Sequence, residues 1–142
     1  MSFMDAVKSC FGKYATFSGR ASRSEFWFFT LFIFIVMIAL YAVIFSSMDF
    51  GGMMMGAQNG TLTPEQMSGS FPVIPFVLLG VFVLVTILPN LSVMVRRLHD
   101  TNRSGWWYWI ALIPLVGPIV LIVFFATQGT DGDNDFGADP LA

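Results

Sequence analysis

The chain has 142 residues, of which 56% are apolar and 11% are charged, and its formal net charge is −2. Soluble domains carry about 25% charged residues, and one core of this size cannot hide so much apolar surface, which argues against a water-soluble globular protein. A single cysteine and a single histidine exclude an internal disulfide, a Cys-based zinc site and a multi-His metal site within one chain. We therefore expect neither a metal nor a cofactor.

Residues 1–24 precede the first long apolar run and form an interfacial N-terminal segment in our interpretation. Apolar residues recur there at spacings of three or four, at Phe3, Val7, Phe11, Tyr14 and Phe17. This pattern predicts a short amphipathic helix lying in the membrane–water interface, with its lysines toward anionic headgroups. The alternative is a frayed, solvated terminus.

Residues 26–45, 73–95 and 106–126 are apolar runs long enough to cross a bilayer. A helix of about 21 residues spans roughly 31 Å, close to the hydrocarbon thickness of about 30 Å, and backbone groups in lipid must pair internally. We predict an all-α, small polytopic membrane protein with three transmembrane helices. It forms a single membrane domain over residues 1–142 and ends in an acidic tail, residues 127–142.

Local signals mark where these helices begin and bend. Ser22 and Glu25 fit a capping box at the start of the first span. Pro89 predicts a kink inside the second span, because proline removes a backbone donor. Pro114 and Pro118 lie inside the third span, so the alternative to a full crossing is a re-entrant hairpin that returns the tail to the cytoplasm.

The basic residues predict the orientation. Four of them lie in residues 1–24 and three in residues 96–105, whereas residues 46–72 and 127–142 contain none. Under the positive-inside rule the N-terminus and the 96–105 loop are cytoplasmic. With three crossings, the Met/Gly-rich loop and the C-terminal tail are then periplasmic.

Two blocks combine arginine, a carboxylate and tryptophan beside an apolar run. The candidate residues for binding lipid or a partner are Arg20, Arg23, Glu25, Trp27, Arg96, Arg97, His99, Asp100, Arg103, Trp106 and Trp107. Guanidinium groups grip phosphate in bidentate fashion, which favours an anionic lipid, a phosphorylated ligand or a partner protein. The alternative is structural, with the acids pairing with arginines and the indoles anchoring the helices.

Other patterns do not support chemistry. His99 beside Asp100 has no accompanying nucleophile, so we expect no catalytic residue. The clustered methionines of the 47–71 loop lack a His or Cys that would favour Cu(I), and we interpret this stretch as a mobile linker or packing loop. The acidic tail lacks the glycine and glutamate that a calcium loop requires.

Five motifs occur in order along the chain: residues 17–27 (FSGRASRSEFW), 88–89 (LP), 96–107 (RRLHDTNRSGWW), 113–117 (IPLVG) and 129–140 (GTDGDNDFGADP). By these motifs the chain resembles the bacterial inner-membrane family called domain of unknown function 805. The resemblance covers nearly the whole chain and implies a bacterial cytoplasmic-membrane protein, but it implies no activity. The Met/Gly loop at 47–71 is longer than the family pattern leads us to expect.

The sequence leads us to expect a non-enzymatic interaction or scaffold protein whose cytoplasmic Arg/Trp face binds anionic lipid headgroups or a partner. A homo-oligomer or an unidentified membrane partner is compatible with this hypothesis, and nucleic acid is not expected. The alternative is an oligomeric transporter or channel for ions or small solutes, for which Thr86, Asn90 and Ser92 are the polar candidates. A lipid-modifying enzyme using His99 as its base is the weaker alternative.

Overall fold

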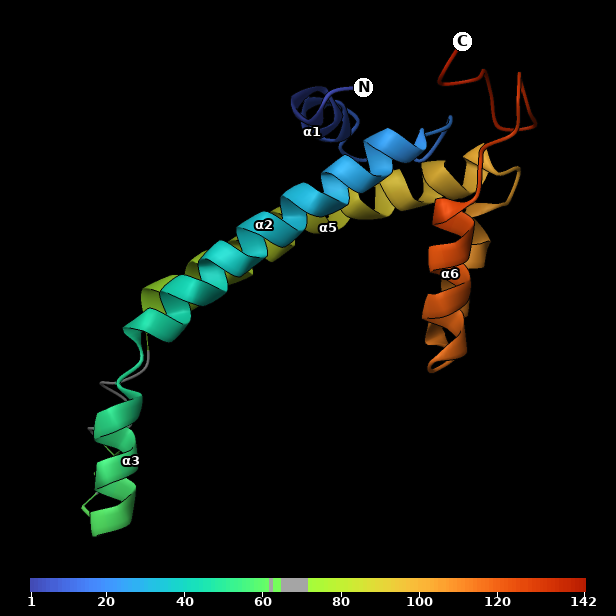
Figure 1. The fold of residues 1–142 in the computed structure, drawn as a ribbon. Helices are drawn as coiled ribbons and strands as arrows, with labels where there is room; N and C mark the ends of the chain where they lie inside the picture. Colours follow the sequence, from blue (N-terminus) through green and yellow to red (C-terminus); the bar gives the residue numbers. More distant parts are fainter. Residues whose placement is uncertain (62, 65–71) are drawn as a thin grey trace. The chain divides into compact units, whose positions relative to one another are not determined.

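The computed structural model describes residues 1–61, 63–64 and 72–142, and within that part of the chain the regular elements are helices joined by loops. The helices are α1 (Phe3–Gly12), α2 (Arg23–Ser47), α3 (Phe50–Asn59), α5 (Val73–Asp100), the 3₁₀ helix η1 (Gly105–Leu112) and α6 (Val116–Ala126), as Figure 1 shows. The all-α prediction is confirmed. The chain divides into unit 1, Met1–Ile33 with Thr86–Ala142, and unit 2, Phe34–Val85.

Helix α1 confirms that the N-terminal segment is helical. The Ser2 hydroxyl accepts a hydrogen bond from the Asp5 backbone N–H, and the Asp5 carboxylate accepts one from the Ser2 backbone N–H. This reciprocal capping box satisfies two orphan donors at the helix start. Ala6 and Cys10 form the buried side of α1. Its position at the membrane interface stays a prediction.

Helices α2 and α5 contain the first two predicted spans. Among the described residues these are the two helices long and apolar enough to cross a membrane, with mean hydropathies of 2.9 and 2.4. Helix α5 runs on past the predicted end at residue 95 to Asp100, and Pro89 lies buried within it. The extra turn matters because it carries Arg96, Arg97 and Asp100 on a continuous helix.

The third predicted span is not one helix. The 3₁₀ helix η1 ends at Leu112, and α6 begins only at Val116, after Leu115 adopts a left-handed backbone with φ of 65°. Pro114 favours the interruption because it has no N–H to donate. The arms η1 and α6 pack against each other as a helical hairpin (Figure 1). An α6 of 11 residues rises about 16 Å, roughly half of the hydrocarbon thickness, so a continuous transmembrane helix over 106–126 was a wrong prediction.

Gly117 is the position that lets the two arms of the hairpin meet. A Cβ atom there would overlap the backbone carbonyl of Ile110, whereas a Cβ at Gly80 in α5 would meet nothing within 4 Å. We therefore expect Gly117→Ala to lower the free energy of unfolding by about 1–3 kcal/mol, because backbone must shift to admit the methyl group. The matched control Gly80→Ala should raise it by about 0.5–1 kcal/mol, as for any open helical glycine. Thermal unfolding in detergent measures both, and equal effects would contradict the packing described here.

Helix α3 replaces part of the loop expected at residues 47–71. The Asp49 carboxylate accepts a hydrogen bond of 2.9 Å from the Gly52 N–H, and Gly60 ends the helix with a left-handed φ of 65°. N-capping by aspartate and C-capping by glycine together define a helix in spite of the glycines within it. Phe50–Asn59 is therefore helical and not irregular, while Met67, one of the clustered methionines, lies outside the described residues.

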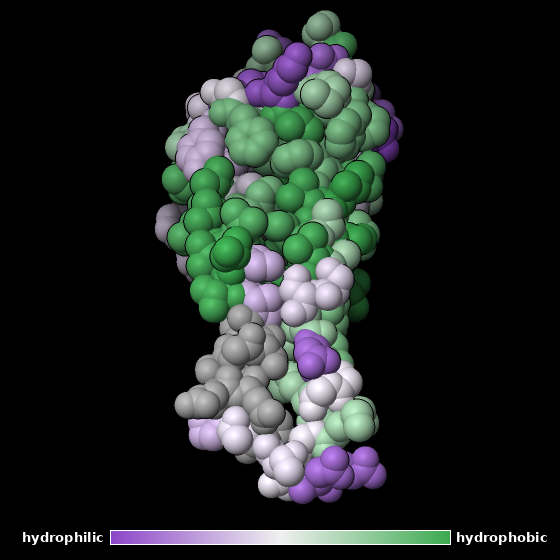
Figure 2. Space-filling model, turned by 90° about the vertical axis from the view of Figure 1, so that its left-hand side faces the viewer, coloured by the Kyte–Doolittle hydropathy of each residue, from purple (hydrophilic) through white to green (hydrophobic). Residues whose placement is uncertain are grey.

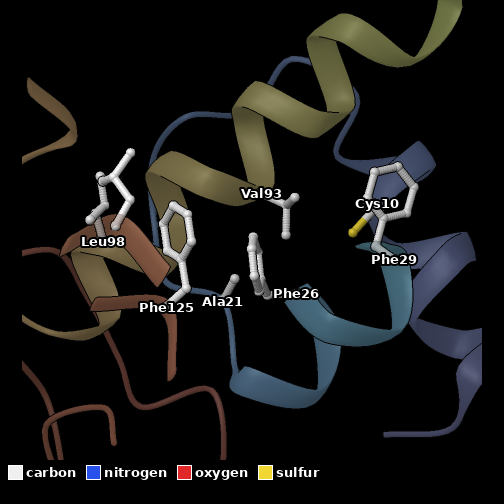
Figure 3. Close-up of a cluster of buried hydrophobic side chains, with 8 residues drawn as sticks. Cys10, Ala21, Phe26, Phe29, Val93, Leu98 and Phe125 are labelled. Atoms are coloured by element: carbon white, nitrogen blue, oxygen red, sulfur yellow. The ribbon is translucent and has the colours of Figure 1, made fainter. Parts of the chain in front are cut away.

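The core of unit 1 gathers side chains from four helices and the segment before α2. It contains Cys10, Ala21, Phe26, Phe29, Val93, Leu98, Leu121 and Phe125, most of which Figure 3 labels. The rings of Phe26 and Phe125 lie 4.6 Å apart between centroids, joining α2 directly to α6. Burial of this cluster fixes the start of α2, the end of α5 and the end of α6 beside one another, and it thereby positions the charged residues that adjoin them.

Candidate functional site

A group of buried charges lies beside this core, and we call it the charged cluster: Arg20, Glu25, Arg96, Arg97 and Asp100. Each of the five residues is at most 6% exposed. Three guanidinium groups therefore face two carboxylates in a largely buried region, at whose edge Arg20 and Asp100 line a small hollow. Buried charges of this kind persist only when they are paired and hydrogen-bonded, so the contacts of each group decide what the cluster does.

Asp100 is the shared acceptor of two arginines. Its Oδ1 atom accepts a hydrogen bond of 3.0 Å from Arg20 Nε, and its Oδ2 atom pairs with Arg97 Nη1. Arg97 lies on the same helix three residues earlier, whereas Arg20 comes from the segment before α2. Asp100 thus joins the first Arg/Trp block of the sequence to the second.

The remaining donors of Arg20 and Arg97 hold backbone carbonyls at the C-terminal end of the chain. Arg20 Nη2 donates to the Thr130 carbonyl at 2.6 Å. Arg97 Nε donates to the Phe125 carbonyl at 3.0 Å, and its Nη2 donates to the Thr127 carbonyl. The last carbonyls of a helix have no partner within the helix, so these guanidinium groups satisfy the end of α6 and the turn that follows it. We call Arg20, Arg97 and Asp100 the arginine clamp.

The clamp brings the C-terminal tail to the arginine end of unit 1. The Thr130 N–H donates to the Asp100 carbonyl at 2.9 Å, and a Cβ atom at Gly129 would overlap the Asp100 carboxylate. This arrangement does not fit the prediction that the tail lies on the side opposite to the arginines.

Arg96 and Glu25 form the second pair of the charged cluster. Arg96 Nη1 lies 2.9 Å from Glu25 Oε1, which also accepts a hydrogen bond of 3.0 Å from the Ser9 hydroxyl of α1. The predicted capping box is only half present, since Ser22 Oγ accepts from the Glu25 N–H at 3.2 Å while the Glu25 carboxylate is engaged with Arg96. Burial raises the pKa of the neighbouring Cys10 thiol to about 12, so this cysteine is neutral and unreactive at neutral pH.

His99 has structural contacts. Its ring stacks on Phe136 of the tail with centroids 4.1 Å apart, and its Nδ1 atom lies 3.1 Å from the Gly19 carbonyl. The Asn134 side chain donates to the His99 carbonyl at 2.9 Å. Sequence reasoning did not single out Asn134 or Phe136. The signal available for them was a turn-forming composition around Gly132 and Gly137, which is typical of an ordered reversal as well as of a solvated tail.

The other predicted site residues are accessible. Arg23, Trp27, Trp106 and Trp107 are exposed, and the partly buried Arg103 places its guanidinium 4.2 Å from the centre of the Phe124 ring. The predicted set therefore separates into a buried group, engaged by carboxylates and carbonyls, and an exposed group at the surface of unit 1.

Two long apolar helices, a short apolar hairpin and a buried arginine clamp define a small helical membrane protein. Residues 14–138 match the family described as "Protein of unknown function (DUF805)", and the chain belongs to this family.

Two curated relatives come from Escherichia coli (strain K12). The chain is 35% identical over 127 residues to "Inner membrane protein YhaI", covering 89% of this chain and 87% of the relative. It is 34% identical over 139 residues to "Inner membrane protein YhaH", covering 96% of this chain and 97% of the relative. No solved structure matches the chain. By this homology the chain is a bacterial inner-membrane protein, as the resemblance predicted.

Proposed function

We propose that the protein is a non-enzymatic membrane protein that binds anionic phospholipid headgroups at the cytoplasmic face through its exposed cations and indoles. The observation that carries the proposal is that the predicted site residues divide into a buried group and an exposed group. Arg20, Arg96 and Arg97 are buried and paired with carboxylates, whereas Arg23 is exposed at the first position of α2. Phosphate recognition therefore belongs to the exposed cations, of which Lys13 also places its Nζ atom 3.9 Å from Glu25 Oε1 of the charged cluster. Among the described residues, Arg96 Nε and Nη2 have no hydrogen-bond partner.

The exposed cations share unit 1 with exposed indoles. Lys8 and Lys13 are exposed on and just after α1, and Trp27 and Trp106 are 41% and 78% exposed. Figure 2 shows hydrophilic residues gathered at the upper end of one face, next to a broad hydrophobic surface. Tryptophan favours the headgroup level, and each basic residue near an anionic leaflet contributes about 1 kcal/mol.

The arginine clamp supports a topology in which the chain crosses the membrane twice and both termini are cytoplasmic. Helices α2 and α5 make the crossings, and the η1–α6 hairpin enters the bilayer from the cytoplasmic side and returns. The clamp supports this arrangement because Thr130 and Asp100 are hydrogen-bonded to each other. The positive-inside rule supports the cytoplasmic assignment, since all seven Lys and Arg residues lie in residues 1–24 and 96–105.

Neutralising the exposed cations should reduce the retention of anionic lipid. The test uses the full chain carrying Lys8→Gln, Lys13→Gln and Arg23→Gln, in nanodiscs that mix phosphatidylglycerol with phosphatidylcholine. Three lost contacts of about 1 kcal/mol each predict at least a tenfold lower apparent affinity for phosphatidylglycerol. Native mass spectrometry after detergent extraction counts the retained lipids of each class.

The control variant keeps every charge by exchanging Lys8→Arg, Lys13→Arg and Arg23→Lys. It should retain phosphatidylglycerol as the unchanged chain does, because the attraction between these exposed cations and anionic headgroups depends on charge more than on geometry. Equal retention of phosphatidylglycerol by the neutralised variant and the unchanged chain would refute the proposal. Preferential retention of phosphatidylcholine by the unchanged chain would refute it as well.

A further inference from the structure

A hollow of about 250 Å³ opens between helix α5 and the 3₁₀ helix η1 in unit 1. Its walls are Ile87, Asn90, Leu91 and Met94 of α5 and Tyr108 of η1. The four α5 residues follow an i, i+3, i+4, i+7 pattern, so they form one stripe along the helix. A stripe of this kind is the usual contact surface between two packed helices.

The hollow contains two polar groups in otherwise apolar surroundings. The Asn90 amide and the Tyr108 hydroxyl are both half-buried, and in the described part of the chain neither takes part in a hydrogen bond with another residue. Asn90 precedes Arg96 by six residues, which places it about 9 Å further along the α5 axis from the charged cluster. At that depth of a spanning helix an amide finds little water, and its unmet hydrogen bonds favour an occupant that supplies them.

We propose that this hollow is the contact surface for a second copy of the chain, in which the Asn90 amides of the two copies hydrogen-bond to each other. A carboxamide has both donors and an acceptor, so two of them related by a two-fold axis satisfy each other. A lipid acyl chain offers neither a donor nor an acceptor, and a lipid ester only accepts, whereas a second carboxamide does both. The apolar members of the stripe, Ile87 and Leu91, pack around the amide pair. This inference is independent of the lipid-binding proposal.

Cysteine cross-linking in native membranes tests the contact directly. The full chain with Cys10→Ser carries a reporter at Ile87→Cys, which leaves Asn90 intact within the stripe. The matched control is Ile119→Cys on α6, because Ile87 and Ile119 are 44% and 63% exposed and both are apolar. Mild oxidation should convert Ile87→Cys into a covalent dimer on a denaturing gel, and Ile119→Cys should stay monomeric. Equal cross-linking at both positions, or none at position 87, would overturn the proposal.

The amide itself is tested by fluorescence energy transfer between labelled copies in liposomes of decreasing protein-to-lipid ratio. Asn90→Leu should weaken dimerisation by about threefold to twentyfold, as for other interhelical hydrogen bonds in membranes. Asn90→Gln keeps the carboxamide and should retain most of the transfer. Unchanged dimerisation of Asn90→Leu would show that the Asn90 amides do not make the contact, and transfer that is absent from the unchanged chain at every ratio would show that the copies do not dimerise. Either result would overturn the proposal.

Discussion

Asp100→Asn is expected to lower the free energy of unfolding by about 3–5 kcal/mol, the usual cost of leaving a buried charge without its partner. The substitution keeps the shape of the side chain but leaves Arg20 and Arg97 without the carboxylate they share. Both guanidinium groups are nearly inaccessible, at 6% and 0% exposure, so water replaces the lost charge poorly. Few other single changes remove the counter-ion of two buried cations at once.

The same variant should also release the tail. Thr130 and Phe125 are held by Arg20 and Arg97, and those contacts depend on guanidinium groups that Asp100 holds in place. We therefore expect proteases added in detergent to cut residues 127–137 much faster in Asp100→Asn than in the unchanged chain, because local opening exposes this backbone. Thermal unfolding and the rate of limited proteolysis measure the two effects.

Asp131→Asn is the matched control, since Asp131 is an exposed acid of the same tail. It removes the same charge from the chain and should change stability by less than about 0.5 kcal/mol. Should Asp100→Asn unfold like this control and keep its tail protected, the clamp would not hold the hairpin and its role would lie elsewhere.

The two long helices were predictable because their signal is strong and local. Helix α2 contains the whole of the predicted 26–45 span, and α5 contains the whole of 73–95. Length and continuous hydropathy define such helices without knowledge of their neighbours. The extension of α5 to Asp100 was not predicted, because the polar sequence after residue 95 reads as a loop until its arginines acquire buried partners.

The hairpin within residues 106–126 was predicted only as the alternative, because hydropathy does not register a reversal of the chain. Residues 106–126 are apolar throughout, and an apolar hairpin has the same composition as an apolar crossing. The informative residues were Pro114 and Gly117. The first has no donor for a continuous helix, and the second admits the Ile110 backbone at close range. Proline alone is tolerated within membrane helices, as Pro89 is within α5, so it did not decide the matter.

The sequence named residues that the structure brings together, but it predicted their contacts only in part. Arg20, Arg97 and Asp100 were all named from composition, and the structure brings them together. The structural alternative named the pairing of the acids with arginines, which the structure shows. The backbone carbonyls that the arginines also bind were not predictable from the two blocks, since a guanidinium group suits a phosphate and a carbonyl equally well. The carbonyls that they bind belong to residues 125–137, whose position depends on the hairpin. The backbone contacts of the arginines therefore depend on an element whose reversal hydropathy does not reveal.

Cysteines at Ser18 and Asp131 should react from the same side of the membrane, and a cysteine at Asn59 should react from the other. All three residues are exposed, which thiol labelling requires. Under the proposed topology, residues 18 and 131 flank the clamp in the cytoplasm, whereas residue 59 follows the first crossing. The outcome is all-or-none for each position, because a hydrophilic maleimide does not cross the bilayer.

The measurement uses the Cys10→Ser background and compares intact with lysed spheroplasts. Asn59→Cys should be labelled in intact spheroplasts, whereas Ser18→Cys and Asp131→Cys should be labelled only after lysis. Labelling of Asp131→Cys in intact spheroplasts would restore three crossings and would separate the tail from Arg20 by the thickness of the membrane. The hydrogen bond of 2.6 Å between Arg20 and the Thr130 carbonyl does not exist in that arrangement, so the experiment tests the arginine clamp and the topology together.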